Sequence, residues 1–321
     1  MSKQQIIIIT GPTASGKSEL AVAVAKHFNG EIISADSRQI YRGLDIGTGK
    51  VEGRWKGKIF VYKSIRHYCI GIFSPKKQCS AADFIRLAKK AIADIRKRGK
   101  IPIIAGGTGF WIDALVYGFS FPEVPPNKAL RKKLAKKDAE KLFSLLKQLD
   151  PVRAGNIDPK NPHRLIRAIE IAKAIGRSPR IEKHAIYDTL WIGISIHPET
   201  LKSNIKKRLA ARMREGIIQE AKTLRRQKLS WKRFYELGLE YRFLADFLRG
   251  ETTKKAMREK LEYAIWHYAK RQLTWFKRNK NINWVQNLRE AIHIIQLFLP
   301  STDSLKNITA CRHSFSFPQT K

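Results

Sequence analysis

Residues 11–18 form the stretch of this sequence with the clearest chemistry. They are Gly11, Pro12, Thr13, Ala14, Ser15, Gly16, Lys17 and Ser18, which fits the pattern G-x-x-x-x-G-K-[ST]. The glycines let the backbone turn so that successive N–H groups face an anion, and the lysine adds positive charge. The serine hydroxyl can reach a Mg²⁺ ion that bridges two phosphates. A glycine turn that binds nothing is the alternative. The motif predicts a diphosphate or triphosphate site without identifying the ligand as ATP.

The segments on either side of this motif are those that its chemistry requires. Ile6–Ile9 is an apolar run typical of a strand buried on both faces, and apolar residues recur at helical spacing over 17–28. Asn29 and Gly30 then end the helix. A strand before the motif and a helix after it favour phosphate binding over an inert turn.

Asp36 follows directly after a second short strand, predicted over 31–35. The carboxyl ends of the strands form the ligand-binding edge of an α/β sheet, so Asp36 is expected beside the phosphate site. Capping of a following helix is its alternative role. The segment 37–50 is rich in glycine and is predicted to be a functional loop.

A third apolar run, 101–105, predicts a strand that leads into Gly106-Gly107-Thr108-Gly109. Such a glycine-rich turn indicates a backbone that another group approaches closely. Many P-loop ATPases place a Mg²⁺-binding aspartate after a later strand. In this sequence only the short run before Asp36 ends in that way, which weakens a motor or GTPase function. A small kinase or another transferase remains.

The net charge points to a polyanionic partner. The chain has 321 residues, with 63 Lys+Arg against 27 Asp+Glu, which gives a formal charge of +36. Nucleic-acid-binding proteins need such a field, whereas enzymes of small metabolites do not. General adaptation to a basic composition is the alternative. Binding to a membrane surface lacks an amphipathic anchor in this sequence.

The cysteine pattern and the apolar runs predict the compartment. Cys69, Cys79 and Cys311 are scattered and form no C-x-x-C pair, which argues for a reducing environment and against a zinc site. We recognise no signal peptide and no apolar run of membrane-spanning length. We therefore expect a cytoplasmic protein that is not bound to a membrane.

Composition and periodicity predict two domains in an α/β fold. Prolines at 122, 125 and 126 mark a boundary, and the basic segment 127–149 and the segment 163–175 are predicted to be helices. We therefore expect an all-helical insertion over 123–184, and a discontinuous core over 1–122 and 185–299. The remaining residues, 300–321, show no periodicity and are expected to form a poorly ordered tail.

The second half of the core is predicted to be a strand followed by long basic helices. The strand covers 190–196, one helix runs from 198 to about 224, and another covers 252–276, before a last strand near 283–285. The helix over 252–276 carries Lys270 and Arg271 among tryptophans, a combination that suits RNA contact and stacking. The alternative for such a helix is an apolar core stripe with a solvated basic face.

Six motifs in this order give the chain a resemblance to a known family. They are GPTASGKS (11–18), ISADSRQIYRGLDIGTGK (33–50), SAADF (80–84), GGTG (106–109), NPHRLIRAIEI (161–171) and AKRQLTWFKR (269–278). The chain resembles the bacterial tRNA dimethylallyltransferases over nearly its full length. The resemblance implies a P-loop NTPase-like, nucleotide-kinase-like parallel sheet flanked by helices, with a helical insertion that grips the anticodon stem-loop of tRNA.

The resemblance also implies the reaction. A dimethylallyl group would pass from dimethylallyl diphosphate to N6 of adenosine 37 in tRNA, with Mg²⁺ as the cofactor, which Ser18 would help to bind. The P-loop would hold the diphosphate of the donor. We expect a monomer. Two other functions stay open at this stage: an ATP-dependent nucleoside or small-molecule kinase, and a non-catalytic RNA-binding protein that retains a P-loop.

Roles for single residues follow from the family motifs. By resemblance, Asp36 is the general base, Thr108 positions the reactants, and Arg212 contacts the diphosphate. The residues that match tRNA-contacting segments, or lie on the basic helix, are Asp36, Ser37, Arg38, Gln39, Thr108, Arg131, His163, Arg164, Leu165, Ile166, Arg167, Leu237, Gly238, Tyr241, Arg242, Lys270 and Arg271. Many relatives have Gly-Tyr-[Lys/Arg] where this chain reads Gly238-Leu-Glu-Tyr241-Arg242, so the register, and which residue touches RNA, stay open there.

Overall fold

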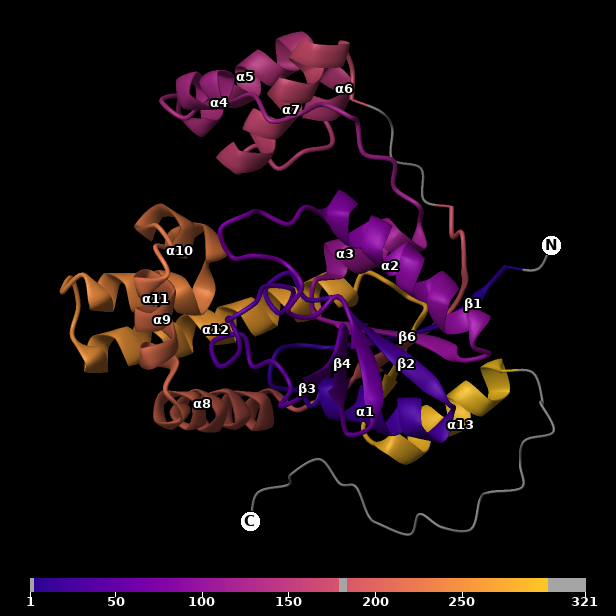
Figure 1. The fold of residues 1–321 in the computed structure, drawn as a ribbon. Coiled ribbons are helices and arrows are strands. Elements are labelled where there is room, and N and C mark those ends of the chain that lie inside the picture. The colour runs from indigo at the N-terminus through magenta and orange to yellow at the C-terminus, as the bar shows by residue number, and fades with distance from the viewer. Residues whose placement is uncertain (1–2, 179–183, 300–321) are drawn as a thin grey trace. The chain divides into compact units, whose positions relative to one another are not determined.

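A computed structural model describes residues 3–178 and 184–299. The chain divides into two compact units, one within Met1–Tyr117 and Ala185–Lys321 and the other within Gly118–His184 (Figure 1). The expected insertion, 123–184, falls within the second unit. The expected tail and Cys311 lie outside the described residues.

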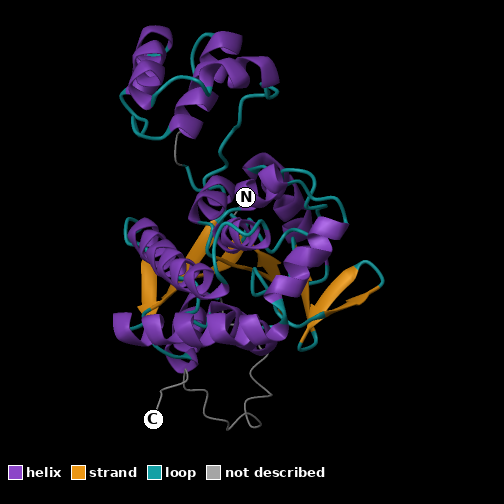
Figure 2. Ribbon diagram, turned by 90° about the vertical axis from the view of Figure 1, so that its left-hand side faces the viewer, coloured by secondary structure: helices purple, strands orange, loops and turns teal. Residues whose placement is uncertain are grey.

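The first unit contains a sheet that is eight-stranded over the described residues. Its strands are β1 (Gln5–Thr10), β2 (Gly30–Ser34), β3 (Arg54–Lys56), β4 (Ile59–Tyr62), β5 (Ile65–Tyr68), β6 (Ile101–Gly106), β7 (Asp188–Ile194) and β8 (Ile282–Val285). The spatial order is β3-β4-β5-β2-β6-β1-β7-β8. Pairing is parallel from β5 to β8. The prediction of an α/β sheet is confirmed, but β3 and β4 add an antiparallel edge that a purely parallel sheet lacks (Figure 2).

The central strand β1 carries the P-loop because its apolar run is buried on both faces. Ile6 to Ile9 are fully buried between β6 and β7. Ile7 and Ile9 pack with helices α1 (Lys17–His27) and α13 (Leu288–Phe298) on one face. On the other face of the sheet lie α2 (Ala81–Lys97) and α3 (Gly109–Val116), as Figure 1 shows. The resulting rigid sheet fixes where the P-loop begins.

Helix α2 shows how local sequence sets a helix start. The Ser80 hydroxyl accepts a hydrogen bond from the Asp83 amide, and the Asp83 carboxylate accepts one from the Ser80 amide. This capping box satisfies two N–H groups that would otherwise lack helical partners. The sequence Ser-Ala-Ala-Asp therefore marks the start of this helix.

The single helix expected from 198 to about 224 is wrong. The structure has α8 (Pro198–Glu215) and then α9 (Ile217–Arg226), separated by Gly216. Gly216 has φ of 100°, a left-handed conformation that ends α8 and that glycine adopts at little cost. Three further helices follow, α10 (Trp231–Leu237), α11 (Leu239–Leu248) and α12 (Lys254–Phe276), of which only α12 was predicted from the sequence.

The second unit is a small helical bundle with its own core. Its helices are α4 (Lys128–Leu134), α5 (Ala139–Leu149), α6 (Pro151–Ala154) and α7 (Pro162–Ile175). Leu134, Leu142, Leu146, Leu165 and Ile169 pack together in its interior. The one helix expected over 127–149 is wrong, because Asp138 caps a new helix through the amide of Lys141.

Candidate functional site

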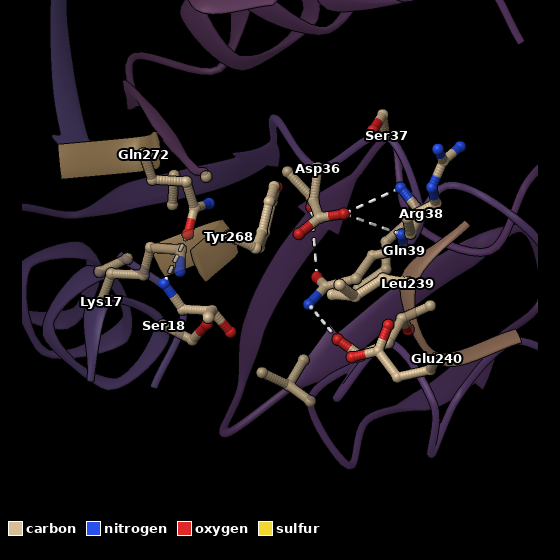
Figure 3. Close-up of a pocket in the computed structure, with 18 of the residues that line it drawn as sticks. Lys17, Ser18, Asp36, Ser37, Arg38, Gln39, Leu239, Glu240, Tyr268 and Gln272 are labelled. Atoms are coloured by element: carbon tan, nitrogen blue, oxygen red, sulfur yellow. Dashed lines mark hydrogen bonds between the residues drawn. The ribbon is translucent and has the colours of Figure 1, made fainter. Parts of the chain in front are cut away.

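The P-loop cavity, of about 260 Å³, opens at the carboxyl ends of β1, β2 and β6. After β2 the chain continues into β3, β4 and β5 on one side of the sheet, whereas after β6 it crosses β1 to reach β7 on the other side. Strands whose connections leave in opposite directions create a crevice at their carboxyl ends, where α/β proteins bind ligands. Lys17, Asp36 and Gly106 line this cavity from the three strand ends, and α8 and α12 supply Arg208 and Tyr268 (Figure 3).

The P-loop has the backbone of an anion nest. Gly11, Ala14 and Gly16 have φ angles of 153°, 63° and 89°, which fold the loop tightly before α1 begins. The hydroxyl of Ser15 is buried and has no hydrogen-bond partner among the described residues. A buried polar group without a partner is costly, so this hydroxyl is consistent with a ligand that accepts its hydrogen bond.

Helix α12 holds the P-loop in place through Gln272. Its Oε1 accepts a hydrogen bond from the Thr13 amide at 2.8 Å, and its Nε2 donates to the Gly107 carbonyl at 3.0 Å. A side chain on Gly107 would clash with this amide, since an added Cβ would lie 2.1 Å from the Gln272 Nε2. One buried glutamine thus joins the two glycine-rich turns at the ends of β1 and β6.

Positive charge is concentrated at one end of the P-loop cavity. Burial, together with the charge of Arg208, lowers the pKa of Lys17 to about 8. Burial and the charge of Arg212 lower the pKa of Arg208 to about 10. Lys17, Arg208 and Arg212 lie close together in a buried space, and each destabilises the charged form of the others. Their arrangement therefore favours a ligand that carries more than one negative charge.

Arg208 and Arg212 differ in how many hydrogen bonds they make within the protein. Arg208 donates one hydrogen bond, to the Gly49 carbonyl at 3.0 Å. Arg212 donates to the Gly47 carbonyl at 3.2 Å and to the buried Glu240 carboxylate at 3.1 Å. Arg208 therefore has more N–H groups left for a ligand, although Arg212 was the residue predicted to contact the diphosphate.

Asp36 uses one carboxylate oxygen to shape the backbone and keeps the other open. Its Oδ1 accepts hydrogen bonds from the amides of Arg38 and Gln39 at 2.8 and 3.2 Å. The capping alternative is therefore correct for Oδ1, although it caps a turn rather than a helix. From the described part of the chain, no hydrogen bond reaches Oδ2. In the view of Figure 3, Tyr268 lies between Asp36 and Lys17.

Thr108 braces the segment on both sides of Asp36. Its amide donates to the Ala35 carbonyl at 3.1 Å, and its hydroxyl accepts from the Ser37 amide at 3.0 Å. Thr108 does not line the P-loop cavity itself. Its contacts suit a positioning role that acts through the backbone around Asp36.

The glycine-rich loop after Asp36 is clamped by a carboxylate from α9. Glu220 Oε2 accepts from the amides of Asp45 and Ile46, both at 2.7 Å, and its Oε1 accepts from the Gly47 amide at 3.0 Å. The Tyr241 hydroxyl donates to the same carboxylate at 2.7 Å. Three consecutive backbone N–H groups on one carboxylate hold this loop against the helices.

The structure distributes the expected tRNA contacts unevenly. Six of them line the P-loop cavity: Asp36, Ser37, Arg38, Gln39, Leu237 and Arg271. Lys270 and Arg242 are exposed, whereas the Tyr241 side chain is buried and used by Glu220. Of these two neighbouring residues, Arg242 is therefore the one whose side chain faces solvent.

In the second unit, only some of the residues expected to contact tRNA are accessible at the surface. His163 and Arg164 are exposed, and Ile166 is partly buried, whereas Leu165 is fully buried in the core of the bundle. The side chain of Leu165 is therefore closed to RNA. Arg131 and Arg167 both pair with the buried Glu170, at 2.7 and 2.5 Å.

Several residues of the site were not predicted from the sequence. Gln272, Arg208, Tyr268 and Glu240 line the cavity from helices far along the chain from the P-loop. Gln272 lies within the motif AKRQLTWFKR, which was the one available signal. The others look like ordinary helix residues in the sequence, because only the packing of α8, α11 and α12 brings them to the cavity.

The protein offers few groups of its own to a metal ion. Over residues 3–178 and 184–299, no three histidine, cysteine or acidic side chains are placed to hold one. Ser18 lines the cavity next to Lys17. Mg²⁺ is commonly bound by substrate phosphates with one or two protein groups, so this donor set fits Mg²⁺ only together with a diphosphate. No helix in the described residues is long and apolar enough to cross a membrane.

Comparison with known proteins decides the family. The family model described as "IPP transferase" matches residues 39–279. The chain belongs to the IPP transferase family. A curated "tRNA dimethylallyltransferase 1" of Hahella chejuensis is 37% identical over 284 residues, which cover 87% of this chain and 91% of that protein. A "tRNA dimethylallyltransferase" of Staphylococcus epidermidis is 38% identical, with 92% and 90% covered.

Solved structures of IPP transferases have the same fold. The tRNA delta(2)-isopentenylpyrophosphate transferase of Staphylococcus epidermidis aligns with a TM-score of 0.64 at 37% identity, covering 92% of this chain and 98% of that one. A eukaryotic dimethylallyltransferase described as acting on tRNA aligns with a TM-score of 0.69 at 25% identity, covering 85% and 70%. The expected P-loop NTPase-like fold and the resemblance stated from the motifs are confirmed.

Proposed function

We propose that this IPP transferase transfers the dimethylallyl group of dimethylallyl diphosphate to N6 of adenosine 37 in tRNA. The products would be N6-isopentenyladenosine and pyrophosphate. The observation that carries the proposal is one cavity that joins the phosphate nest and cations around Lys17 to the open carboxylate oxygen of Asp36. We further propose that the protein acts in the cytoplasm as a monomer.

The nest and the cations would bind the diphosphate and stabilise the leaving group. As the bond between the allylic carbon and the bridging oxygen breaks, the electron pair stays on pyrophosphate. Lys17, Arg208 and the P-loop amides face this growing negative charge, and preorganised donors of this kind supply much of the barrier lowering in such reactions. Mg²⁺, held by Ser18 and the phosphate oxygens, would add charge neutralisation when bound.

Asp36 would act as the general base on the adenine amine. As the N6 nitrogen forms its bond to the allylic carbon, one N6 proton passes to Oδ2, because Oδ1 is engaged by the turn amides. Such proton transfer contributes about 10²–10⁴ in rate. The adenine must leave its stack to reach the cavity, so we expect base flipping.

The basic surface would supply most of the affinity for tRNA. Arg38 and Arg271 line the cavity and would contact the RNA backbone near the flipped base. His163 and Arg164 present exposed positive or polar groups on the insertion. The anticodon stem-loop is the part of tRNA that carries the target, so we assign both surfaces to it.

The direct test is incubation of the protein with labelled dimethylallyl diphosphate and unmodified tRNA. We expect label in adenosine 37 of the tRNA, and release of pyrophosphate. Phosphate transfer from ATP without any need for dimethylallyl diphosphate would identify a kinase instead. Binding of tRNA without label transfer would identify an RNA-binding protein that has lost activity.

A further inference from the structure

A second cavity, of about 870 Å³, adjoins the P-loop cavity across a thin wall. Val51 lines both cavities. Thr48 lines only the P-loop cavity, whereas Gly49 and Lys50 line only the second one. The loop that carries these four residues therefore separates the two cavities. We call the second one the Trp55 cavity.

An aromatic ring forms one side of the Trp55 cavity. Trp55 lies on the edge strand β3, and 48% of its surface is exposed. Phe60 holds the indole edge-to-face, with ring centroids 5.4 Å apart and planes at 73°. Gly71 leaves the indole room, since an added Cβ would lie 3.3 Å from its Cζ2. In the described residues no ring stacks face to face on Trp55, so its surface is open to a flat partner.

The charges that line the Trp55 cavity favour a base over a phosphate. Three cations, Arg42, Lys50 and Lys58, are balanced by three carboxylates, Asp45, Glu52 and Glu215. Lys50 and Asp45 pair at 2.5 Å. Glu52 and Glu215 form no ion pair with any described residue, so they remain available as hydrogen-bond acceptors. A cavity without excess positive charge attracts phosphate weakly, whereas carboxylates accept hydrogen bonds from the amino groups of bases.

We propose that the Trp55 cavity binds a nucleobase of the RNA next to the target adenosine. The base would stack on Trp55, and its exocyclic amino group would donate to Glu52 or Glu215, so that adenine, cytosine or guanine fits and uracil does not. Single-stranded RNA is recognised in this way, by stacking on aromatic side chains and by hydrogen bonds to base edges. The position rests on the proposed function, because consecutive nucleotides would enter two cavities separated by one loop.

The test combines protein variants with altered RNA. Affinity would be measured for anticodon stem-loop RNAs that are intact, or abasic at the nucleotide on either side of the target. Trp55→Ala should weaken binding of the intact RNA about tenfold, in the range that stacking of one base supplies. Trp55→Phe should keep most of the affinity. One of the two abasic RNAs should bind wild type about tenfold more weakly and bind Trp55→Ala no worse than the intact RNA does.

A second pair of variants tests the hydrogen bonds. Glu52→Gln and Glu215→Gln keep the size of each side chain, and one of them should remove the preference for an amino-bearing base over uracil at the same RNA position. Equal losses for intact and abasic RNAs in Trp55→Ala would overturn the proposal. So would unchanged affinity of the intact RNA. Both outcomes are read from binding, so they stay distinct from a failure of prenyl transfer in wild type.

Discussion

The side chain of Gln272 accepts a hydrogen bond from the backbone amide of Thr13, 259 positions earlier in the chain, at 2.8 Å. The same side chain donates to Gly107. The P-loop of this protein is therefore held from α12 as well as from β1. Helix α12 also carries Tyr268 and Arg271 into the cavity, so one helix connects the proposed diphosphate site with the proposed RNA surface.

Gln272→Ala should weaken binding of the diphosphate donor more than binding of tRNA. It leaves the Thr13 amide and the Gly107 carbonyl without partners, which costs about 1–3 kcal/mol each when such groups are buried. We expect the KM for dimethylallyl diphosphate to rise about tenfold. Gln272→Glu should be worse, because it brings negative charge toward the diphosphate. Thr274→Ala, on the exposed side of the same helix, is the control. It should change neither the KM for the donor nor the affinity for tRNA.

Lys17 makes donor binding depend on pH. Its pKa of about 8 means that free enzyme loses this positive charge as pH rises above about 8. The value of kcat/KM for the donor should therefore fall above that pH, since this parameter follows ionisation of the free enzyme. A profile that stays flat to pH 9.5 would contradict a contact between Lys17 and the diphosphate.

The same lysine should lower the stability of the fold while serving its function. The pKa of Lys17 is about 8 in the folded state and 10.5 for an unperturbed lysine, as in the unfolded chain. Between these two values the unfolded chain binds more protons, so stability rises with pH. Lys17→Met should raise the melting temperature at pH 7 and abolish donor binding. Its advantage in stability should shrink as the pH approaches 10. Lys26→Met, at the exposed end of α1, should show neither effect.

Asp36→Asn separates the two roles of this residue. Asparagine keeps an oxygen for the amides of Arg38 and Gln39 but cannot serve as a base. Prenyl transfer should fall by about 10²–10⁴ while tRNA affinity stays within a few fold. Asp36→Ala should also abolish transfer, with a further loss of stability of about 1 kcal/mol from the missing cap. Near-normal turnover of the asparagine variant would remove Asp36 from the base role.

The first buried strand and the P-loop follow from local sequence, and these features were predictable. Ile6–Ile9 and Gly11–Ser18 specify a buried strand and a phosphate loop with no help from distant residues. The breaks at Gly216 and Asp138 were not predicted, because apolar spacing continues through both positions. In each case a backbone conformation or a cap, rather than a change in periodicity, ends the helix.

The wider site depends on packing that periodicity does not encode. Arg208 occupies a position in a basic helix that looks no different from Lys206 or Lys207 next to it in the sequence. The neighbours are exposed, whereas Arg208 turns toward Lys17 and Gly49. Glu240 likewise becomes a site residue only because α11 packs against α12. Long-range contacts of this kind are invisible in a single sequence.

Glu220→Gln should loosen the loop that separates the two cavities. The Glu220 carboxylate accepts hydrogen bonds from the amides of all three residues 45–47. The NH₂ group of a glutamine cannot accept a hydrogen bond, so at least one of these amides loses its partner. Tryptic cleavage at Lys50 should become faster, and kcat/KM should fall about tenfold, since a loosened loop misplaces groups on the cavity wall. Tyr241→Phe removes only one of the four contacts and should have a smaller effect.

The control for this experiment is Glu236→Gln. Glu236 is an exposed carboxylate that pairs with Arg233 at 3.1 Å and does not touch the loop. It should leave both the cleavage rate and kcat/KM unchanged. Equal cleavage at Lys50 in Glu220→Gln and in wild type would show that the clamp is dispensable.

Arg131 and Arg164 distinguish folding of the insertion from binding of RNA. Burial raises the pKa of Glu170, but hydrogen bonds from Arg131, Arg167 and the Asn127 amide outweigh burial and bring it to about 2. Arg131→Ala leaves this buried carboxylate with fewer partners, so the stability of the protein should fall by about 1–3 kcal/mol, read from denaturant unfolding.

Arg164→Ala should do the reverse. Arg164 is exposed, and its side chain forms no ion pair with the described residues, so unfolding should be unchanged. Affinity for tRNA should fall, and the slope of log K against log salt should decrease by about 1, as expected for the loss of one phosphate contact. Arg131→Ala could instead weaken tRNA binding, with the same change in salt slope and no loss of stability. The ion pair of Arg131 with Glu170 would then not stabilise the fold. In that case Arg131 would contact RNA directly.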